Sequence, residues 1–191
     1  MGKEIILSTI RQNRPPEATL PEIPDFFPDA GEKLEMFIEA VELAAGKVFK
    51  ITHPENINDV LKEHFPGELN IASTVNTIVS NVDLGRIRNP GDLESVDVAV
   101  IPARLGVAEN GAVWVNDEDL VHRVLPFITQ HLVLVLSRER ICWNMHEAYR
   151  NIASLLGGFG VFIAGPSKTA DIEQSLVIGA QGARSFSVIL I

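Results

Sequence analysis

The feature that most constrains this sequence is a series of short, nearly continuous apolar runs. The clearest of them covers residues 96–103 and is rich in valine. A strand that shows no alternation of polar and apolar residues is buried on both faces, which is typical of a parallel sheet covered by helices. Four further runs of this kind lie at residues 112–115, 132–136, 160–164 and 185–191.

Helical patterns alternate with these runs. Apolar residues recur at helical spacing over residues 34–45, and Asp29 to Glu32 form a possible capping box in front of them. The same reasoning predicts helices at 54–65, 118–125, 144–156 and 169–178, and further short strands at 47–51, 69–73 and 77–81. We therefore expect a three-layer α/β domain, Rossmann-like in its alternation, with a mostly parallel sheet. Ligands in such sheets bind beyond the carboxyl ends of the strands.

The N-terminal part differs from the rest of the chain. Residues 2–13 predict a short helix with Ile5, Ile6 and Ile10 on one side. Residues 14–28 hold five of the eleven prolines, and because proline lacks an amide donor and fixes φ, this stretch predicts an extended arm. The sequence thus predicts an N-terminal helix and proline-rich arm over residues 1–28 and one α/β domain over residues 29–191.

Charge and cysteine content exclude several classes of protein. Lys and Arg number 16 against 25 Asp and Glu, a net charge of −9, whereas nucleic-acid binding requires clustered cations. The single cysteine, Cys142, excludes a disulfide framework or a cluster held by several thiolates. No apolar run is long enough to cross a bilayer, and the N-terminus lacks the pattern of a signal peptide. We expect a cytoplasmic protein without membrane insertion.

Two stretches resemble known site motifs but lack required residues. Gly165 to Thr169 ends like a phosphate-binding loop, yet Phe162 and Ser167 stand where that loop requires glycine. The segment from His146 to Arg150 resembles a zinc-protease helix but has arginine in place of the second histidine. Asn144 with Glu147 is better explained as a helix cap, and no metal site is predicted.

Polar residues gather at the turns of the C-terminal part. Residues 152–191 carry only four charged side chains, and all of them lie in turns or in the first turns of the predicted helix. The loop at 103–112 follows the 96–103 strand, and we expect it to meet the C-terminal turns at one pocket. The candidate ligand-binding residues are Arg104, Gly106, Gly111, Gly165, Ser167, Lys168, Thr169, Gln181, Gly182 and Arg184, with Glu109 and Asp171 as candidate catalytic carboxylates.

A structural explanation stays open for each of these residues. Ser167 or Thr169 can cap the predicted helix, and Asp171 and Glu173 favour its positive end. The loop at 103–112 can equally be a simple turn with exposed charges. If the candidates do form a site, Lys168 and Arg184 are suited to pair with a small anionic ligand.

The C-terminal segment also resembles a known family. The stretch Gly-Pro-Ser-Lys-Thr-Ala-Asp-Ile-Glu at residues 165–173, followed by Leu-Val-Ile-Gly at 176–179 and by Gly182, is similar to the signature of the LUD domain. Within that family the chain resembles the lactate utilization protein C group. The resemblance implies the fold of the NagB/RpiA/CoA-transferase-like superfamily and a role in the oxidation of L-lactate to pyruvate, as one component of a multi-protein system.

The resemblance also implies partners and one point of divergence. Larger LUD proteins carry ferredoxin-type cysteine runs, so a chain with Cys142 alone resembles the cluster-free subunit, binds no cofactor itself and has iron–sulfur subunits as partners. The family usually has histidine in a Gly-x-His-Gly-Pro turn, where this chain has Gln181, with Gly182 and Ala183 after it. Glutamine cannot act as a general acid or base near neutral pH.

Three functions remain open at this point. The first is a cluster-free subunit or accessory protein of an L-lactate oxidation system, without turnover of its own. The second is a stand-alone ligase- or transferase-type enzyme acting on a small carboxylate or nucleotide, with Glu109 or Asp171 as its base. The third is a non-catalytic interaction or regulatory module, which the acidic residues between 14 and 63 suit.

Overall fold

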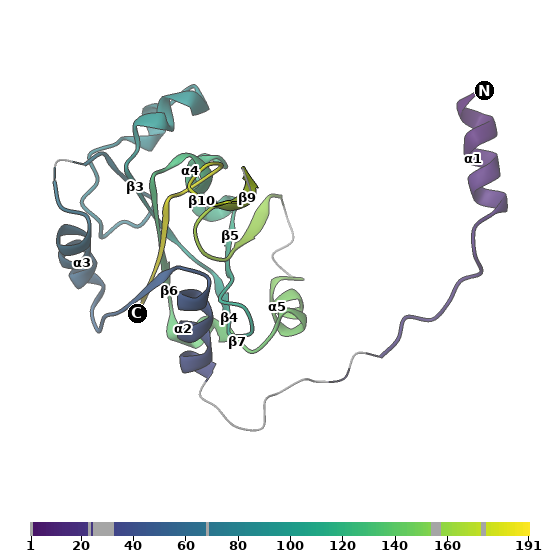
Figure 1. Ribbon diagram of the computed structural model, residues 1–191, viewed down its shortest axis with the longest axis horizontal. Helices are drawn as coiled ribbons and strands as arrows, with labels where there is room; N and C mark the ends of the chain where they lie inside the picture. The colour runs from purple at the N-terminus through teal and green to yellow at the C-terminus, as the bar shows by residue number, and fades with distance from the viewer. Residues whose placement is uncertain (1, 23, 25–32, 68, 154–157, 173–174) are drawn as a thin grey trace.

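A five-stranded, all-parallel sheet forms the centre of the computed structural model, which describes residues 2–22, 24, 33–67, 69–153, 158–172 and 175–191. The strand order is β1-β11-β6-β3-β2. The strands are β1 (Lys47–Lys50), β2 (Ile71–Ser73), β3 (Val98–Pro102), β6 (His131–Leu136) and β11 (Ser185–Leu190). The prediction of a parallel sheet built from two-sided apolar runs is confirmed for β3, β6 and β11 (Figure 1).

A second sheet of four strands with mixed directions follows the order β7-β4-β5-β8. Its strands are β4 (Leu105–Val107), β5 (Val113–Asn116), β7 (Ile141–Cys142) and β8 (Gly160–Ile163). The runs at 112–115 and 160–164 are therefore strands, as predicted. They belong to a second sheet, so the expected arrangement of three layers around a single sheet is wrong. Only five residues, 108–112, join β4 to β5, and a parallel neighbour requires a crossover of a dozen or more. The two strands pair antiparallel instead.

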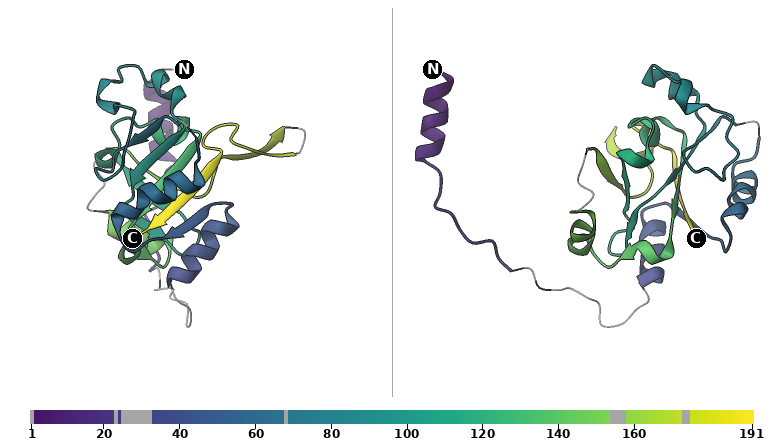
Figure 2. Two further views of the ribbon diagram at one scale, coloured as in Figure 1. Left: turned by 90° about the vertical axis from the view of Figure 1, so that its left-hand side faces the viewer. Right: turned by 180° about the vertical axis from the view of Figure 1, so that it is seen from behind.

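Helices cover both sheets in layers (Figures 1 and 2). One face of the parallel sheet packs on α3 (Ile57–His64), and the other face shares a core with α2 (Lys33–Leu43), α4 (Leu125–Ile128) and the second sheet. The outer face of the second sheet packs on α5 (Met145–Ile152). Because apolar side chains are covered on each face, the ends of the parallel strands are the accessible part of the main sheet.

The predicted helix at 169–178 is wrong. These residues form an antiparallel hairpin of β9 (Lys168–Ile172) and β10 (Ser175–Ile178), in which Thr169 pairs with Val177. The hairpin projects from the body of the molecule (left view of Figure 2). Threonine, isoleucine and valine prefer strands because their branched side chains are restricted in a helix. Helix caps by Ser167 or Thr169, and dipole contacts by Asp171, are excluded with the helix itself.

Two other predicted elements also differ from the structure. The helix expected at 118–125 is replaced by a 3₁₀ turn at Asp117–Asp119 and the short helix α4. The strand expected at 77–81 is a series of bends and turns. The helix expected at 54–65 is confirmed as a 3₁₀ turn at Pro54–Asn56 followed by α3. The helix expected at 144–156 is confirmed as α5 as far as Ile152, and residues 154–156 lie outside the described residues. The capping box at 29–32 lies outside the described residues.

The N-terminal helix is confirmed as α1 (Lys3–Gln12), and it contains no buried residue. Ile5, Ile6 and Ile10 are each half or more exposed. Figure 1 shows α1 apart from the two sheets. None of the helices in the described ranges is long and apolar enough to cross a bilayer.

Gly111 fixes the turn between β4 and β5 against α2. Its φ of 68° is in the left-handed region, and a Cβ added at this residue would lie 2.6 Å from the backbone nitrogen of Val41. A side chain at Gly111 would therefore be strained by its own backbone and would collide with the helix. Gly111 holds this turn in place by packing, so its role needs no ligand.

We predict that Gly111→Ala lowers the free energy of unfolding by about 2–4 kcal/mol. The alanine would have to adopt a left-handed backbone conformation, and its Cβ would also collide with the backbone of Val41. Gly91→Ala is the matched control, since the nearest atom to an added Cβ there is 3.6 Å away and no unusual φ is required. The control should change stability by no more than about 0.5 kcal/mol. Urea denaturation followed by circular dichroism measures both. Equal stability of the two variants would contradict the packing.

Candidate functional site

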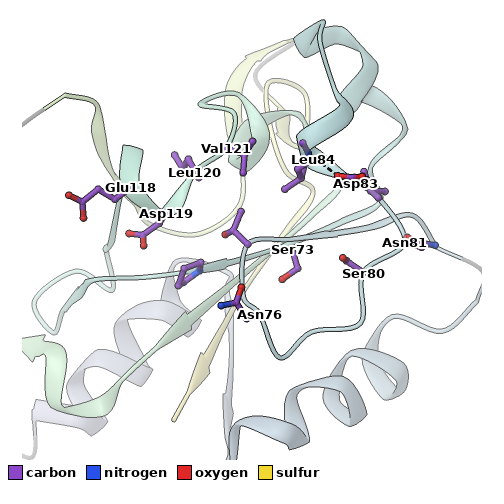
Figure 3. Close-up of a pocket in the computed structure, with 14 residues that line it drawn as sticks. Ser73, Asn76, Ser80, Asn81, Asp83, Leu84, Glu118, Asp119, Leu120 and Val121 are labelled. Carbon is purple, nitrogen blue, oxygen red and sulfur yellow. Dashed lines mark hydrogen bonds between the residues drawn. The ribbon is translucent and has the colours of Figure 1, made fainter.

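A cavity of about 620 Å³ lies where β2 and β3 end (Figure 3). We call it the polar cavity, because most of its lining side chains carry hydroxyl, amide or carboxylate groups. These residues are Ser73, Thr74, Asn76, Ser80, Asn81, Asp83, Glu118 and Asp119. Its position at the carboxyl edge of a parallel sheet is where ligands of such folds bind.

The polar cavity offers hydrogen-bonding groups without positive charge. The Oγ1 atom of Thr74 is buried and has no hydrogen-bond partner in the described part of the chain. The hydroxyl of Ser73 already contacts the backbone of Val75, at 3.0 Å from the nitrogen and 3.2 Å from the oxygen. Because its described lining residues include three carboxylates and no Lys or Arg, the cavity suits neutral hydroxyl or amide groups better than an anion.

A second cavity of about 420 Å³ opens at the carboxyl ends of β3, β6 and β11. It is lined by Val75, Pro102, Ala103, Arg104, Val135, Ser137, Arg140 and Ile191. We call it the arginine cavity, because Arg104 and Arg140 are the charged side chains among its described lining residues. Pro102 lines both this cavity and the polar cavity, so the two adjoin at the end of β3.

An ion pair stands between the two cavities. The Nε of Arg104 donates to Oδ2 of Asp119 at 2.6 Å, and its Nη2 donates to Oε2 of Glu118 at 3.3 Å. The side chain of Asp119 is 6% exposed, whereas that of Arg104 is 40% exposed. The hydrogen bond to Asp119 raises the pKa of Arg104, so the guanidinium stays charged. The pair therefore places a carboxylate beside the polar cavity and a cation beside the arginine cavity.

Cys142 is not suited to act as a nucleophile. It lies 2% exposed in the core under α5, and burial raises the pKa of its thiol to about 12. Among the residues that the structure describes, no three His, Cys, Asp or Glu side chains are grouped as a metal site requires. The capping interpretation of the adjacent segment is confirmed, because Asn144 Oδ1 accepts from the backbone nitrogen of Glu147 at 2.9 Å.

The structure brings the two C-terminal glycine turns together. The backbone nitrogen of Gln181 donates to Oγ of Ser167 at 3.3 Å, and that of Gly179 donates to the Ser167 carbonyl at 2.9 Å. A Cβ added at Gly182 would lie 3.2 Å from Cβ of Ser167. Gly165 packs against the Ala44 carbonyl after α2. Ser167, Gln181 and Gly182 therefore form one small turn cluster at the base of the β9–β10 hairpin.

Other candidates from the sequence lie elsewhere. Glu109 accepts a hydrogen bond from the backbone nitrogen of Met145 at 2.9 Å, so it stabilises the start of α5. Lys168 donates to the Ala44 carbonyl from the exposed side of β9. Neither Glu109 nor Lys168 lines the polar cavity or the arginine cavity. Thr169 and Asp171 are part of β9.

The sheet topology separates Arg184 from Arg104. Arg184 precedes β11 and lies at its amino end, whereas Arg104 follows β3 at the carboxyl edge. Parallel strands start at one edge of a sheet and end at the other, so these two cations flank opposite edges. Gly106 is a packing residue, because an added Cβ would lie 2.7 Å from Leu136 Cδ2. Of the described residues named from the sequence, Arg104 lines the arginine cavity, and none lines the polar cavity.

Sequence reasoning missed most of the residues around these cavities, notably Thr74, Asp119, Ser137 and Arg140. Three of them could have been found from chain position alone. Thr74 and Ser137 directly follow β2 and β6, and Arg140 ends the 3₁₀ turn after β6. The rule that sheet ligands bind after strand ends applies to every parallel strand, and not only to β3.

Comparison with known proteins identifies relatives of one family. Residues 86–191 match the LUD domain. Lactate utilization protein C of Shouchella clausii is 30% identical over 94 residues, which is 47% of this chain and 41% of that protein. The protein of the same name from Geobacillus kaustophilus is 26% identical over 141 residues, covering 71% of this chain and 56% of that protein. The matches thus span about half the length of these relatives.

A solved structure supports the fold. The crystal structure of a DUF162 family protein from Deinococcus radiodurans superposes with a TM-score of 0.63 at 12% sequence identity. The match covers 83% of this chain and 95% of that protein. At this identity the likeness concerns the fold alone.

We predict that Arg104→Met lowers the free energy of unfolding by about 1–3 kcal/mol, because it leaves the buried carboxylate of Asp119 without its partner. Arg86→Met is the matched control: its pair with Asp83 is 88% and 62% exposed, so its loss should cost at most about 0.5 kcal/mol. Urea denaturation of both variants measures the difference. A loss in Arg104→Met no larger than in the control would contradict the buried pair.

We also predict that Cys142 resists alkylation in the folded protein. With a thiol pKa of about 12, almost no thiolate exists near pH 8, and the sulfur is shielded from reagent. Iodoacetamide labelling followed by mass spectrometry should be slow in native buffer and fast in urea. Equal rates in the two conditions would show that the thiol is accessible in the folded state.

Proposed function

Because the chain belongs to the LUD domain family, we propose that it acts in lactate utilization, as a cluster-free subunit or accessory protein of a system that oxidises L-lactate to pyruvate. The family assignment of residues 86–191 carries this proposal, and the names of the curated relatives support it. The superfamily we propose for the α/β domain is the NagB/RpiA/CoA-transferase-like one, with the division from the N-terminal arm near residue 28.

The cysteine content supports the cluster-free role. An iron–sulfur cluster is ordinarily held by four thiolates, and these 191 residues contain one cysteine, which is buried. Oxidation of L-lactate to pyruvate releases two electrons. In this proposal the electrons pass to iron–sulfur subunits that bind this chain, and the chain itself contributes binding and assembly.

Exposed apolar side chains favour a component of a complex over a stand-alone enzyme. Ile5, Ile6 and Ile10 are exposed on α1, and Leu176 and Ile178 are 66% and 46% exposed on the hairpin. Apolar surface of this kind marks contacts with partner proteins. The turn cluster of Ser167, Gln181 and Gly182 at the base of the hairpin belongs to this proposed contact region.

The alternative of a ligase or transferase has less support in the geometry. Such an enzyme requires a base or nucleophile beside its substrate. Glu109 is engaged at the start of α5 and lines neither cavity at the carboxyl edge, and Asp171 is part of strand β9 in the hairpin. We therefore place ligand binding at the carboxyl edge and propose no catalytic base in this chain.

We predict that deleting the gene for this chain abolishes growth on L-lactate and leaves growth on glucose intact. An affinity-tagged copy should restore growth and co-purify with cysteine-rich iron–sulfur proteins, while the purified chain alone should not oxidise L-lactate. Growth curves and mass spectrometry of the purified complex measure these outcomes. Normal growth of the deletion strain on L-lactate would contradict the proposed function.

A further inference from the structure

We infer that the arginine cavity is a binding site for a small organic monocarboxylate, held by Arg140 and Arg104. This inference deepens the proposed function, and it rests on that function only for the choice of L-lactate and pyruvate as probes. The cavity lies at the carboxyl ends of β3, β6 and β11, and within the described part of the chain the charged side chains that line it are the two arginines.

Arg140 supplies the uncompensated charge. It ends the 3₁₀ turn that follows β6, and it is exposed. Within the described ranges its guanidinium has neither an ion pair nor a hydrogen bond. A guanidinium presents a planar fork of N–H donors that matches the two oxygens of a carboxylate. An unpaired arginine at the mouth of a cavity is thus suited to bind such a group.

Arg104 supplies a second cation in a fixed position. Its Nε and Nη2 atoms donate to Asp119 and Glu118, and its Nη1 makes no hydrogen bond to any described residue. Because the two carboxylates already hold the guanidinium in place, little side-chain entropy is lost when Nη1 binds a further oxygen. Arg104 and Arg140 also both line the neighbouring cavity of about 270 Å³, together with Lys33, Glu139 and Glu147, so the two arginines border the same two cavities.

The remaining walls select the kind of anion. The side chains of Val75, Pro102, Ala103 and Val135 are apolar and suit a short aliphatic end rather than a second charged group. Ser137 also lines the cavity, and its hydroxyl has no partner in the described part of the chain. A hydroxyl there can bond an oxygen on the carbon next to the carboxylate. Two cations, one hydroxyl and apolar walls together fit a small 2-hydroxy or 2-oxo acid.

The test is titration calorimetry of the purified full chain with L-lactate, pyruvate, acetate and inorganic phosphate, each in separate runs. The carboxylates should bind, and Arg140→Gln should weaken them by about tenfold or more, since it removes a charge-assisted pair. Arg140→Lys keeps the charge but loses the planar fork, so its affinity should fall between those of wild type and Arg140→Gln.

Arg138→Gln is the matched control. It removes the same charge two residues away, but Arg138 Nη2 donates to the Ile51 carbonyl at 2.9 Å and lines neither arginine-walled cavity. It should change affinity less than twofold. Circular dichroism of every variant confirms that it is folded before titration.

Three results would overturn the inference: no binding of any carboxylate to the folded wild type, an equal loss in Arg140→Gln and Arg138→Gln, or phosphate binding as tight as the carboxylates. Binding of acetate and pyruvate but not L-lactate, lost in Arg140→Gln, would support the carboxylate site and count against a direct role of this chain in holding lactate. The growth test of the deletion strain decides the proposed function independently of these titrations.

Discussion

Burial of the parallel sheet on both faces determines where this protein can bind anything. The strands β3, β6 and β11 are covered by α3 on one side and by α2 and the second sheet on the other, so their faces are apolar and closed. Polar groups are costly to bury without partners, and they are therefore found where the strands end. Both candidate cavities open at the carboxyl edge for this reason.

The Arg104–Asp119 pair joins the two sheets at that edge. Arg104 lies between β3 of the parallel sheet and β4 of the mixed sheet, and Asp119 follows β5. The pair thus links the segment between β3 and β4 to the segment that follows β5. It also separates charge, because carboxylates face the polar cavity and guanidinium groups face the arginine cavity. A chain with a net charge of −9 can in this way maintain a local cationic site.

Predictions from the sequence succeeded where burial alone decides the structure. Runs such as 96–103 and 132–136 do not alternate between polar and apolar residues, so the strands they form are expected to be buried on both faces of the sheet. The sheet to which a run belongs depends on loop length and pairing, so 112–115 was found as a strand but not as part of a second sheet. The segment 169–178 is predicted as a helix but forms a hairpin. In so short a run, the spacing of apolar residues fits the 3.6-residue period of a helix and the two-residue period of a strand equally well. Arg104 could be named from the sequence as a cavity-lining residue because it follows the most clearly predicted strand. The hydrogen bond from Met145 to Glu109 could not be predicted, because it joins residues far apart in the sequence.

The accessibility of the arginine cavity is consistent with a component that holds no redox group. In a cluster-free subunit, electrons from a bound hydroxy acid must leave for a group on another chain. A ligand enclosed in the core would be separated from that group by protein, whereas Arg104 is 40% exposed and Arg140 is exposed. A carboxylate held by these two side chains would keep its other end open to a partner that covers the carboxyl edge. In the proposed function, ligand binding and assembly with an iron–sulfur subunit would therefore both use this open edge of the sheet.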